Sequence, residues 1–328
     1  MPVPARVRRQ AAVFARLQSR ATGGAHADSL AEAITRLLGN PDSRLSAEEQ
    51  AALWRYRARG TEPLGVLTSL FVLGQALPAS VVRTAFGDDF AGARACGLLE
   101  GGVGRALVRA ALSLSVHDGR LLFSDRDHAD PPSDHVLGAT RATLVLERAL
   151  PRTQLGNVLE LGTGAGLLAL SLAGHARSVT ATDVAPRALA LAALNGALAG
   201  MTNVTWLRAD RFHGLERRRF DFVTGNLPFV ISPDRRYVFR DGGLAEDGFL
   251  ASVISGVGRH LRPGGFALFL GQWIHREDEA EDERLAPWFV AAGCDALVLR
   301  LDAEPADTYA ARWSGGPAHG LTASARDR

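Results

Sequence analysis

The 328-residue chain contains no lysine, so all 37 of its basic residues are arginines. They are balanced by 35 acidic residues, and a formal net charge of +2 gives no global field that would draw the chain onto nucleic acid. The two cysteines, Cys96 and Cys294, stand in unrelated contexts, which excludes a disulfide framework and a cysteine-rich zinc site. We therefore expect a cytoplasmic setting and no bound metal.

Long apolar runs are also missing. The longest, residues 64–77, is interrupted by Thr68, Ser69 and Gln75 and is too short to span a bilayer, so no membrane segment is expected. Apolar residues make up 47% of the chain and charged residues 22%, which excludes a chain that is disordered throughout. This composition suits one large or two modest folded domains.

Residues 1–130 have the pattern of a helical domain that ends in a β-hairpin. Helices are predicted over residues 28–39, 51–60, 64–77 and 88–99. Ser29 or Asp28 would cap the first of them, and Ser46 with Glu49 forms a capping box before the second. Asp118-Gly119 is a strong turn signal between strands within 105–116 and 120–124. Helices followed by a hairpin resemble a winged-helix domain.

Residues 131–328 follow a polar, proline-containing linker, and after Pro151 short apolar strands alternate with helices. The predicted strands are 158–161, 178–182, 204–207, 220–224, 266–270 and 295–301. The predicted helices are 134–150, 166–173, 186–199, 246–261 and 281–292. This alternation predicts an α/β domain with a Rossmann-like, doubly wound parallel sheet.

The most informative motif is the run from Asn157 to Gly166, in which a strand leads through a glycine-rich turn into a helix. The glycines are spaced G-x-G-x-G and not G-x-G-x-x-G as in dinucleotide sites. Glu160, just before the turn, would repel a pyrophosphate but attract a cationic sulfonium with an ammonium group. The motif favours S-adenosylmethionine over a nicotinamide cofactor. The expected cofactor-binding residues of the turn are Glu160, Gly162, Thr163, Gly164 and Gly166.

Two aspartates follow the next strands. Asp183 ends the strand 178–182, 21 residues past Gly162, where it can accept both ribose hydroxyls, or else cap helix 186–199. Asp210 follows strand 204–207 and could accept from an adenine amino group, or else be a solvated loop acid. We expect both to contribute to cofactor binding.

The segment Asn226-Leu227-Pro228-Phe229 directly follows the fourth strand, so it faces the same crevice. Asn226 supplies a side-chain acceptor, and Leu227 is extended by the following proline, which leaves its carbonyl free. Phe229 adds a flat apolar face. Two acceptors and a ring suit a planar NH₂ group, and these four residues are the predicted catalytic residues. Asn226 is also an expected cofactor-binding residue.

Together, ELGTGAG, Asp183, Asp210 and NLPF resemble the class I methyltransferases with an asparagine-proline-proline-aromatic motif. These include release-factor glutamine, adenine amino and small-domain RNA guanine methyltransferases, and the resemblance covers residues 134–301. It departs from the pattern at Leu227, which replaces the first proline. A bacterial group with a winged-helix-like N-terminal part is most similar, since its motif also continues into segments like 230–233 and 239–243. There Arg240 could bind a substrate carboxylate or phosphate, or pair with Asp241.

The resemblance implies N-methylation of a planar or amino nitrogen, with S-adenosylmethionine and an unidentified methyl acceptor as partners. Alternatives are a natural-product N- or O-methyltransferase and an RNA- or protein-modifying methyltransferase, the RNA case being disfavoured by the low net charge. A non-catalytic sensor that binds DNA is disfavoured by the intact NLPF segment. A nicotinamide oxidoreductase is disfavoured by the glycine spacing. The sequence carries no signal for an oligomeric state.

Overall fold

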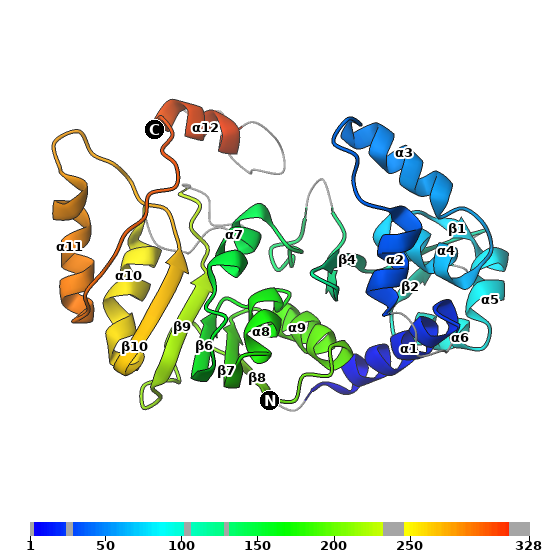
Figure 1. The fold of residues 1–328 in the computed structure, drawn as a ribbon, viewed down its shortest axis with the longest axis horizontal. Helices are drawn as coiled ribbons and strands as arrows, with labels where there is room; N and C mark the ends of the chain where they lie inside the picture. Colours follow the sequence, from blue (N-terminus) through cyan, green and yellow to red (C-terminus); the bar gives the residue numbers. More distant parts are fainter. Residues whose placement is uncertain (1–2, 24–28, 102–105, 128–130, 232–245, 315–328) are drawn as a thin grey trace. The chain divides into compact units, whose positions relative to one another are not determined.

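A computed structural model describes residues 3–23, 29–101, 106–127, 131–231 and 246–314 (Figure 1). The chain divides into two compact units, one holding residues 2–127 and 190–202 and the other residues 128–189 and 203–328. Helix α9 (Pro186–Leu198) contributes residues to both units. The division into domains 1–130 and 131–328 therefore stays a proposal.

The first unit begins with helices and ends with short strands. Its helices are α1 (Ala5–Ala21), α2 (Leu30–Leu38), α3 (Ala47–Arg57), α4 (Pro63–Leu67), the π-helical turn η1 (Thr68–Val72), α5 (Ala79–Phe86) and α6 (Asp89–Ala95). Its strands are β1 (Leu77–Pro78), β2 (Leu99–Gly101), β3 (Leu107–Ala110), β4 (Ser113–His117) and β5 (Arg120–Ser124). The predicted caps are confirmed: Ser29 caps α2, and Ser46 forms a capping box with Glu49 at α3.

The unit has the connectivity of a winged helix. The strands in the position of the wing are β2 and β3, and not the predicted hairpin β4–β5. Strands β1, β3 and β2 form, in that order, a three-stranded antiparallel sheet, and α5 and α6 lie between β1 and β2 in the chain. The hairpin β4–β5 at Asp118-Gly119 is a separate ladder. Both turn residues have positive φ, 46° and 71°, as a two-residue hairpin turn requires.

The second unit is built around a parallel sheet. Its elements are α7 (Arg141–Ala149), β6 (Leu155–Leu161), α8 (Leu167–Ala173), β7 (Ala176–Asp183), the start of α9, β8 (Val204–Arg208), β9 (Phe220–Asn226), α10 (Gly248–Val257), the 3-10 turn η2 (Gly258–His260), β10 (Leu261–Leu270), α11 (Glu281–Ala292) and α12 (Ala306–Ser314). The strand order is β10-β9-β6-β7-β8, and every pairing is parallel (Figure 1). The predicted doubly wound α/β fold is confirmed.

Two predicted elements of this unit are wrong. Helix α7 begins at Arg141, where the Thr140 side chain accepts from the backbone N–H of Thr143, and not at residue 134. Residues 295–301 are not a strand, and the side chain of Leu297 there is 84% exposed. The short apolar run in this segment indicates a strand, but strand formation also requires a paired neighbour.

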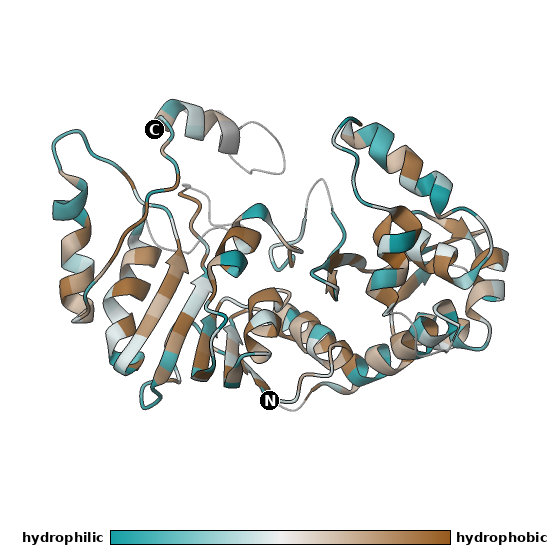
Figure 2. Ribbon diagram, viewed as in Figure 1, coloured by the Kyte–Doolittle hydropathy of each residue, from teal (hydrophilic) through white to brown (hydrophobic). Residues whose placement is uncertain are grey.

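The central strands β6, β7 and β9 are mostly buried, whereas most of the edge strand β10 is exposed or half-buried. Brown, apolar residues run through the sheet in Figure 2. On one face Leu159, Leu161 and Val223 form a core with residues of α10. The chain runs from β6 outward to β8 and then returns to the other side of β6 as β9. A crevice at the carboxyl ends of β6 and β9 is the expected ligand position in such a sheet.

Candidate active site

The glycine turn after β6 has the backbone that only glycine adopts easily. Gly162, Gly164 and Gly166 have φ of 67°, 54° and 91°, and Gly166 stands immediately before helix α8. A Cβ at Gly164 would meet no atom within 4 Å, so open space lies beside the turn. The backbone amide of Thr163 donates to the Thr182 carbonyl at 2.8 Å, which ties the turn to β7.

Glu160 is enclosed within the turn instead of facing its open side. Its side chain is 1% exposed, and the hydroxyl of Thr163 donates to its Oε2 at 2.7 Å. Burial, with a smaller contribution from the nearby Asp183 carboxylate, raises the pKa of Glu160 to about 8. The structure therefore gives Glu160 and Thr163 a bracing role in the turn. The predicted attraction of Glu160 for a cationic ligand would act only once this carboxyl loses its proton.

Asp183 joins the glycine turn to helix α9. Its Oδ2 accepts from the backbone amide of Gly164 and its Oδ1 from that of Ala185, both at 2.9 Å. Burial raises the pKa of this carboxyl, while the two amide hydrogen bonds oppose the shift. The side chain thus stabilises the first turn of α9 and also lies at the glycine turn, which accommodates both of its predicted roles.

Asp210 lies at the surface after β8. Its side chain is 58% exposed, and its Oδ1 pairs with the Arg211 guanidinium at 3.2 Å. Arg211 has a positive φ of 49°, uncommon for a residue other than glycine, and its guanidinium also donates to the hydroxyl of Ser252 on α10 at 3.1 Å. The predicted contact of Asp210 with adenine remains a prediction.

Asn226 ends β9 next to the glycine turn. Its carbonyl oxygen lies 3.9 Å from the position that a Cβ on Gly162 would take. Its side-chain Nδ2 donates to the hydroxyl of Thr143 on α7 at 3.0 Å. The amide oxygen, Oδ1, is buried and has no hydrogen-bond partner among the described residues. The Asn226 amide is therefore fixed through its Nδ2, and its Oδ1 is an unpartnered acceptor at the carboxyl end of the sheet.

The other residues of the motif differ in what they contact. The Leu227 side chain is 3% exposed and belongs to the core formed with Leu161 and Leu250, so leucine anchors the loop where the family has a proline. Pro228 and Phe229 are half-buried. Arg240 and Asp241 lie outside the described residues.

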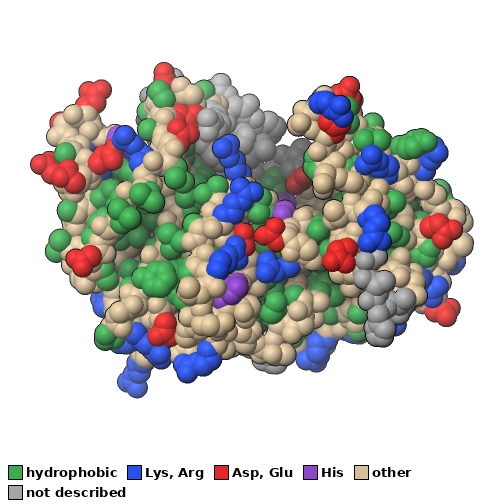
Figure 3. Space-filling model, viewed as in Figure 1, with side chains coloured by type: hydrophobic (Ala, Val, Ile, Leu, Met, Phe, Trp, Pro, Cys, Tyr) green, Lys and Arg blue, Asp and Glu red, His purple; other side chains and the backbone are tan. Residues whose placement is uncertain are grey.

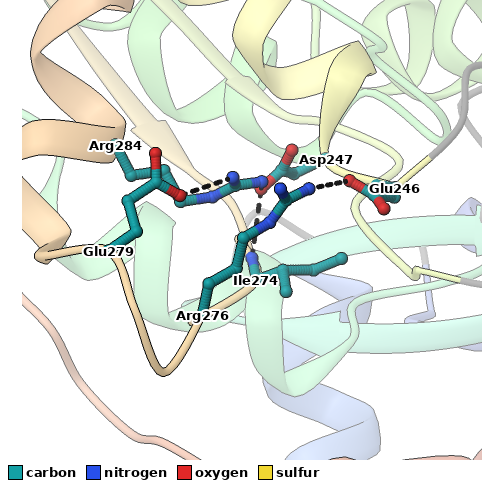
Figure 4. Close-up of polar contacts among 6 residues, drawn as sticks. All are labelled: Glu246, Asp247, Ile274, Arg276, Glu279 and Arg284. Atoms are coloured by element: carbon teal, nitrogen blue, oxygen red, sulfur yellow. Dashed lines mark hydrogen bonds and ion pairs between the residues drawn. The ribbon is translucent and has the colours of Figure 1, made fainter.

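Sequence reasoning missed a set of contacts just beyond β9 and β10. The hydroxyl of Tyr309, on α12, accepts from the backbone amide of Ile231 at 2.9 Å and donates to Gln272 at 3.3 Å. The backbone amide of Ile274 donates to the buried Asp247 at 3.1 Å, and Arg284 donates to the same carboxylate oxygen at 2.6 Å (Figure 4). A rule that strand ends carry the site would have drawn attention to residues 271–274.

The described residues contain no group of three His, Cys, Asp or Glu side chains that could hold a metal ion. Within the same residues, no helix combines the length and apolar character needed to cross a membrane.

Comparison with known proteins relates the α/β part of the chain to a described family. Residues 138–270 match the family described as methyltransferase small domain, a match that contains the glycine turn, both aspartates and NLPF. The chain carries a class I S-adenosylmethionine-dependent methyltransferase domain. Residues 26–111 match a family described only as a domain of unknown function. The resemblance stated from the motifs is thereby confirmed.

Proteins similar to this chain include release factor glutamine methyltransferases. That of Salmonella typhimurium is 32% identical over 40% of this chain and 53% of its own length. That of Deinococcus radiodurans is 36% identical over 44% of this chain and 55% of its own length. The chain thus spans about half the length of these relatives. A solved ribosomal protein L11 methylase from Lactobacillus delbrueckii subsp. bulgaricus is 26% identical, with 41% of this chain and 61% of that chain covered and a TM-score of 0.32.

Proposed function

We propose that this protein transfers a methyl group from S-adenosylmethionine to the nitrogen of a side-chain carboxamide in a protein. The observation that carries the proposal is the buried, unpartnered Oδ1 of Asn226, whose Nδ2 is held by Thr143. A buried acceptor without a partner costs about 1–3 kcal/mol, so a substrate N–H that reaches it would regain that free energy. A planar NH₂ group presents such an N–H.

The residues around the turn fit the cofactor. The open space beside Gly164 leaves room for a ligand close to the backbone, and Asp183 lies at the same turn with acceptor oxygens suited to ribose hydroxyls. When bound, S-adenosylmethionine supplies an electrophilic methyl group: the nitrogen gains the methyl, the sulfur keeps the bonding electron pair, and a nitrogen proton leaves to solvent. Asn226 and the Leu227 carbonyl would orient the nitrogen, and Phe229 would pack against its planar group.

Relatives that act on glutamine support a carboxamide as the acceptor. Because the chain spans only about half of those proteins, a release factor is used here as a first probe and is not carried over as the substrate. Natural-product and RNA acceptors have no comparable observation in their favour.

The test incubates the protein with methyl-labelled S-adenosylmethionine and, in parallel, a purified bacterial release factor, total bacterial protein, RNA and a metabolite extract. We expect label in protein, on a glutamine or asparagine nitrogen identified by mass spectrometry. Label confined to RNA or to metabolites would contradict the proposal.

Asn226→Ala tests the role of the amide. It should lower turnover by about 10²-fold, the scale of one lost transition-state hydrogen bond. Affinity for S-adenosylhomocysteine, measured by calorimetry, should stay within a few-fold, because the glycine turn and Asp183 are untouched. Near-normal turnover of this variant would mean that NLPF is only a turn.

A further inference from the structure

We propose that Trp273 determines acceptor specificity: its indole N–H donates to the carbonyl oxygen of the same carboxamide whose N–H bonds to Asn226. This inference rests on the proposed function and adds no chemical step to it.

The first observation is a second buried polar atom without a partner. Nε1 of Trp273 is enclosed, and no acceptor among the described residues reaches it. An indole nitrogen can only donate, so an enclosed, unpaired Nε1 leaves a donor that a ligand oxygen can satisfy. Asn226 Oδ1 is likewise a buried acceptor without a hydrogen-bond partner among the described residues. The two form a complementary donor and acceptor.

The second observation is where the two residues lie. Strands β9 and β10 are neighbours, and Asn226 pairs in register with Leu270, three residues before Trp273. Gln272 is linked through the Tyr309 hydroxyl to Ile231, which follows the NLPF segment by two residues. Trp273 therefore lies at the same end of the sheet as the NLPF segment.

The third observation is that both neighbours of Trp273 are held, Gln272 by its side chain and Ile274 by its backbone amide. Gln272 is bound by Tyr309, and the amide of Ile274 donates to Asp247. Asp247 and Arg284 form a largely buried ion pair, with side-chain exposures of 7% and 12% (Figure 4). Such a framework fixes the position of the indole before a ligand binds, which lowers the entropy cost of recognition.

A donor and an acceptor at the same end of the sheet can together recognise a carboxamide by its two ends. A carboxylate has no N–H for Asn226, and a lysine amine has no carbonyl for Trp273. Either would leave one buried group unpaired, the situation in which polar sites discriminate most strongly. The pair thus distinguishes glutamine or asparagine side chains from glutamate and lysine.

Nuclear magnetic resonance of the ¹⁵N-labelled full chain tests the contact directly. The chain has five tryptophans, each with one indole N–H signal, and the signal lost in Trp273→Phe identifies that of Trp273. With S-adenosylhomocysteine present, propionamide should shift this signal in a saturable way, whereas propionate of nearly the same shape should not. No shift with propionamide, or an equal shift with propionate, would overturn the inference, whether or not methylation is detected.

Kinetics provide the second arm, with the protein acceptor labelled in the previous test. Trp273→Phe keeps an aromatic ring and removes the N–H, so KM for the acceptor should rise about tenfold, the scale of one hydrogen bond. Affinity for S-adenosylhomocysteine should stay within twofold. The matched control is Trp288→Phe on α11, a partly buried indole packed on the core, which should leave KM unchanged. A normal KM in Trp273→Phe beside an inactive Asn226→Ala would overturn this inference and leave the proposed function standing.

Discussion

The orientation of the Asn226 amide depends on a hydroxyl 83 residues earlier in the chain. Thr143 accepts from Asn226 Nδ2 and lies 2.9 Å from the hydroxyl of Thr140, so the amide is fixed by a short chain of hydroxyls. Without the Thr143 hydroxyl the amide could rotate, and its oxygen would no longer be reserved for a substrate N–H.

Thr143→Val, which keeps the shape but removes the hydroxyl, should therefore lower kcat about tenfold. Thr143→Ser should restore most of it, and binding of S-adenosylhomocysteine should not change in either variant. Steady-state kinetics on the labelled acceptor check this. A valine variant with parental kcat would show that the Asn226 amide needs no partner on α7.

The buried carboxyl of Glu160 gives stability a defined pH dependence. Its pKa is about 8 in the folded chain against 4.5 for an ordinary glutamate, so the folded state holds a proton between these values that the unfolded state releases. Stability should fall as the pH rises from 4.5 and should level off above about 8.

Glu160→Gln removes this titration and keeps an acceptor for Thr163. Between pH 5 and pH 9, Tm of the parent should fall by roughly 5–10 °C more than that of the variant. Thermal melts across this range measure the difference, and Glu48→Gln on the exposed side of α3 serves as the control. Parallel curves for parent and Glu160→Gln would mean that Glu160 is ionised throughout.

Among the elements, α9 is notable because its second half belongs to the first unit. Asn195, fully buried on this helix, accepts from the backbone amide of Phe123 at 2.8 Å and donates to the carbonyl of the same residue at 2.9 Å. It thereby takes the place of a neighbouring strand beside β5. The Phe123 ring packs edge-to-face against Phe14 and Phe71, so this backbone lies in the core of the unit.

Asn195→Ala would leave a buried N–H and a buried C=O unpaired, and we expect a loss of about 2–4 kcal/mol in the free energy of unfolding. The matched control is Asn203→Ala, which removes an amide that donates to the Ala173 and Ala176 carbonyls from a half-buried position. It should cost about 1 kcal/mol. Urea unfolding measures both, and equal losses would contradict the argument.

Elements whose signals are local could be predicted from the sequence. Strands β6 to β9 lie close to the predicted ranges because each is an apolar run bounded by turn residues, and the glycine turn was readable from its spacing. The position of the wing was not, because its strands β2 and β3 are only three and four residues long. Within the site, the Thr143–Asn226 bond and the enclosure of Glu160 depend on packing that no local pattern encodes.

For the whole molecule, charge and the winged-helix connectivity lead to opposite expectations about DNA. In this topology α6 would be the helix that enters the major groove. Here α1 covers it: Arg16 pairs with Asp89 at 2.6 Å, and Arg6 donates to the Cys96 carbonyl at 3.3 Å. Basic and acidic side chains are both spread over the face in Figure 3, in keeping with the net charge of +2.

The full chain should accordingly show no sequence-selective binding to duplex DNA at physiological salt. The helix that would enter the groove, α6, is packed against α1, and the net charge of +2 gives the chain no strong overall field of one sign. Fluorescence anisotropy with a randomised duplex pool, followed by selection and sequencing, checks this at about 50 and 150 mM salt, where specific and electrostatic binding separate. Weak binding that vanishes at the higher salt would agree with the prediction, since scattered arginines alone produce it. Enrichment of one sequence that survives at the higher salt would mean that α1 moves away from α6, and the winged-helix unit would then be a DNA reader attached to a methyltransferase.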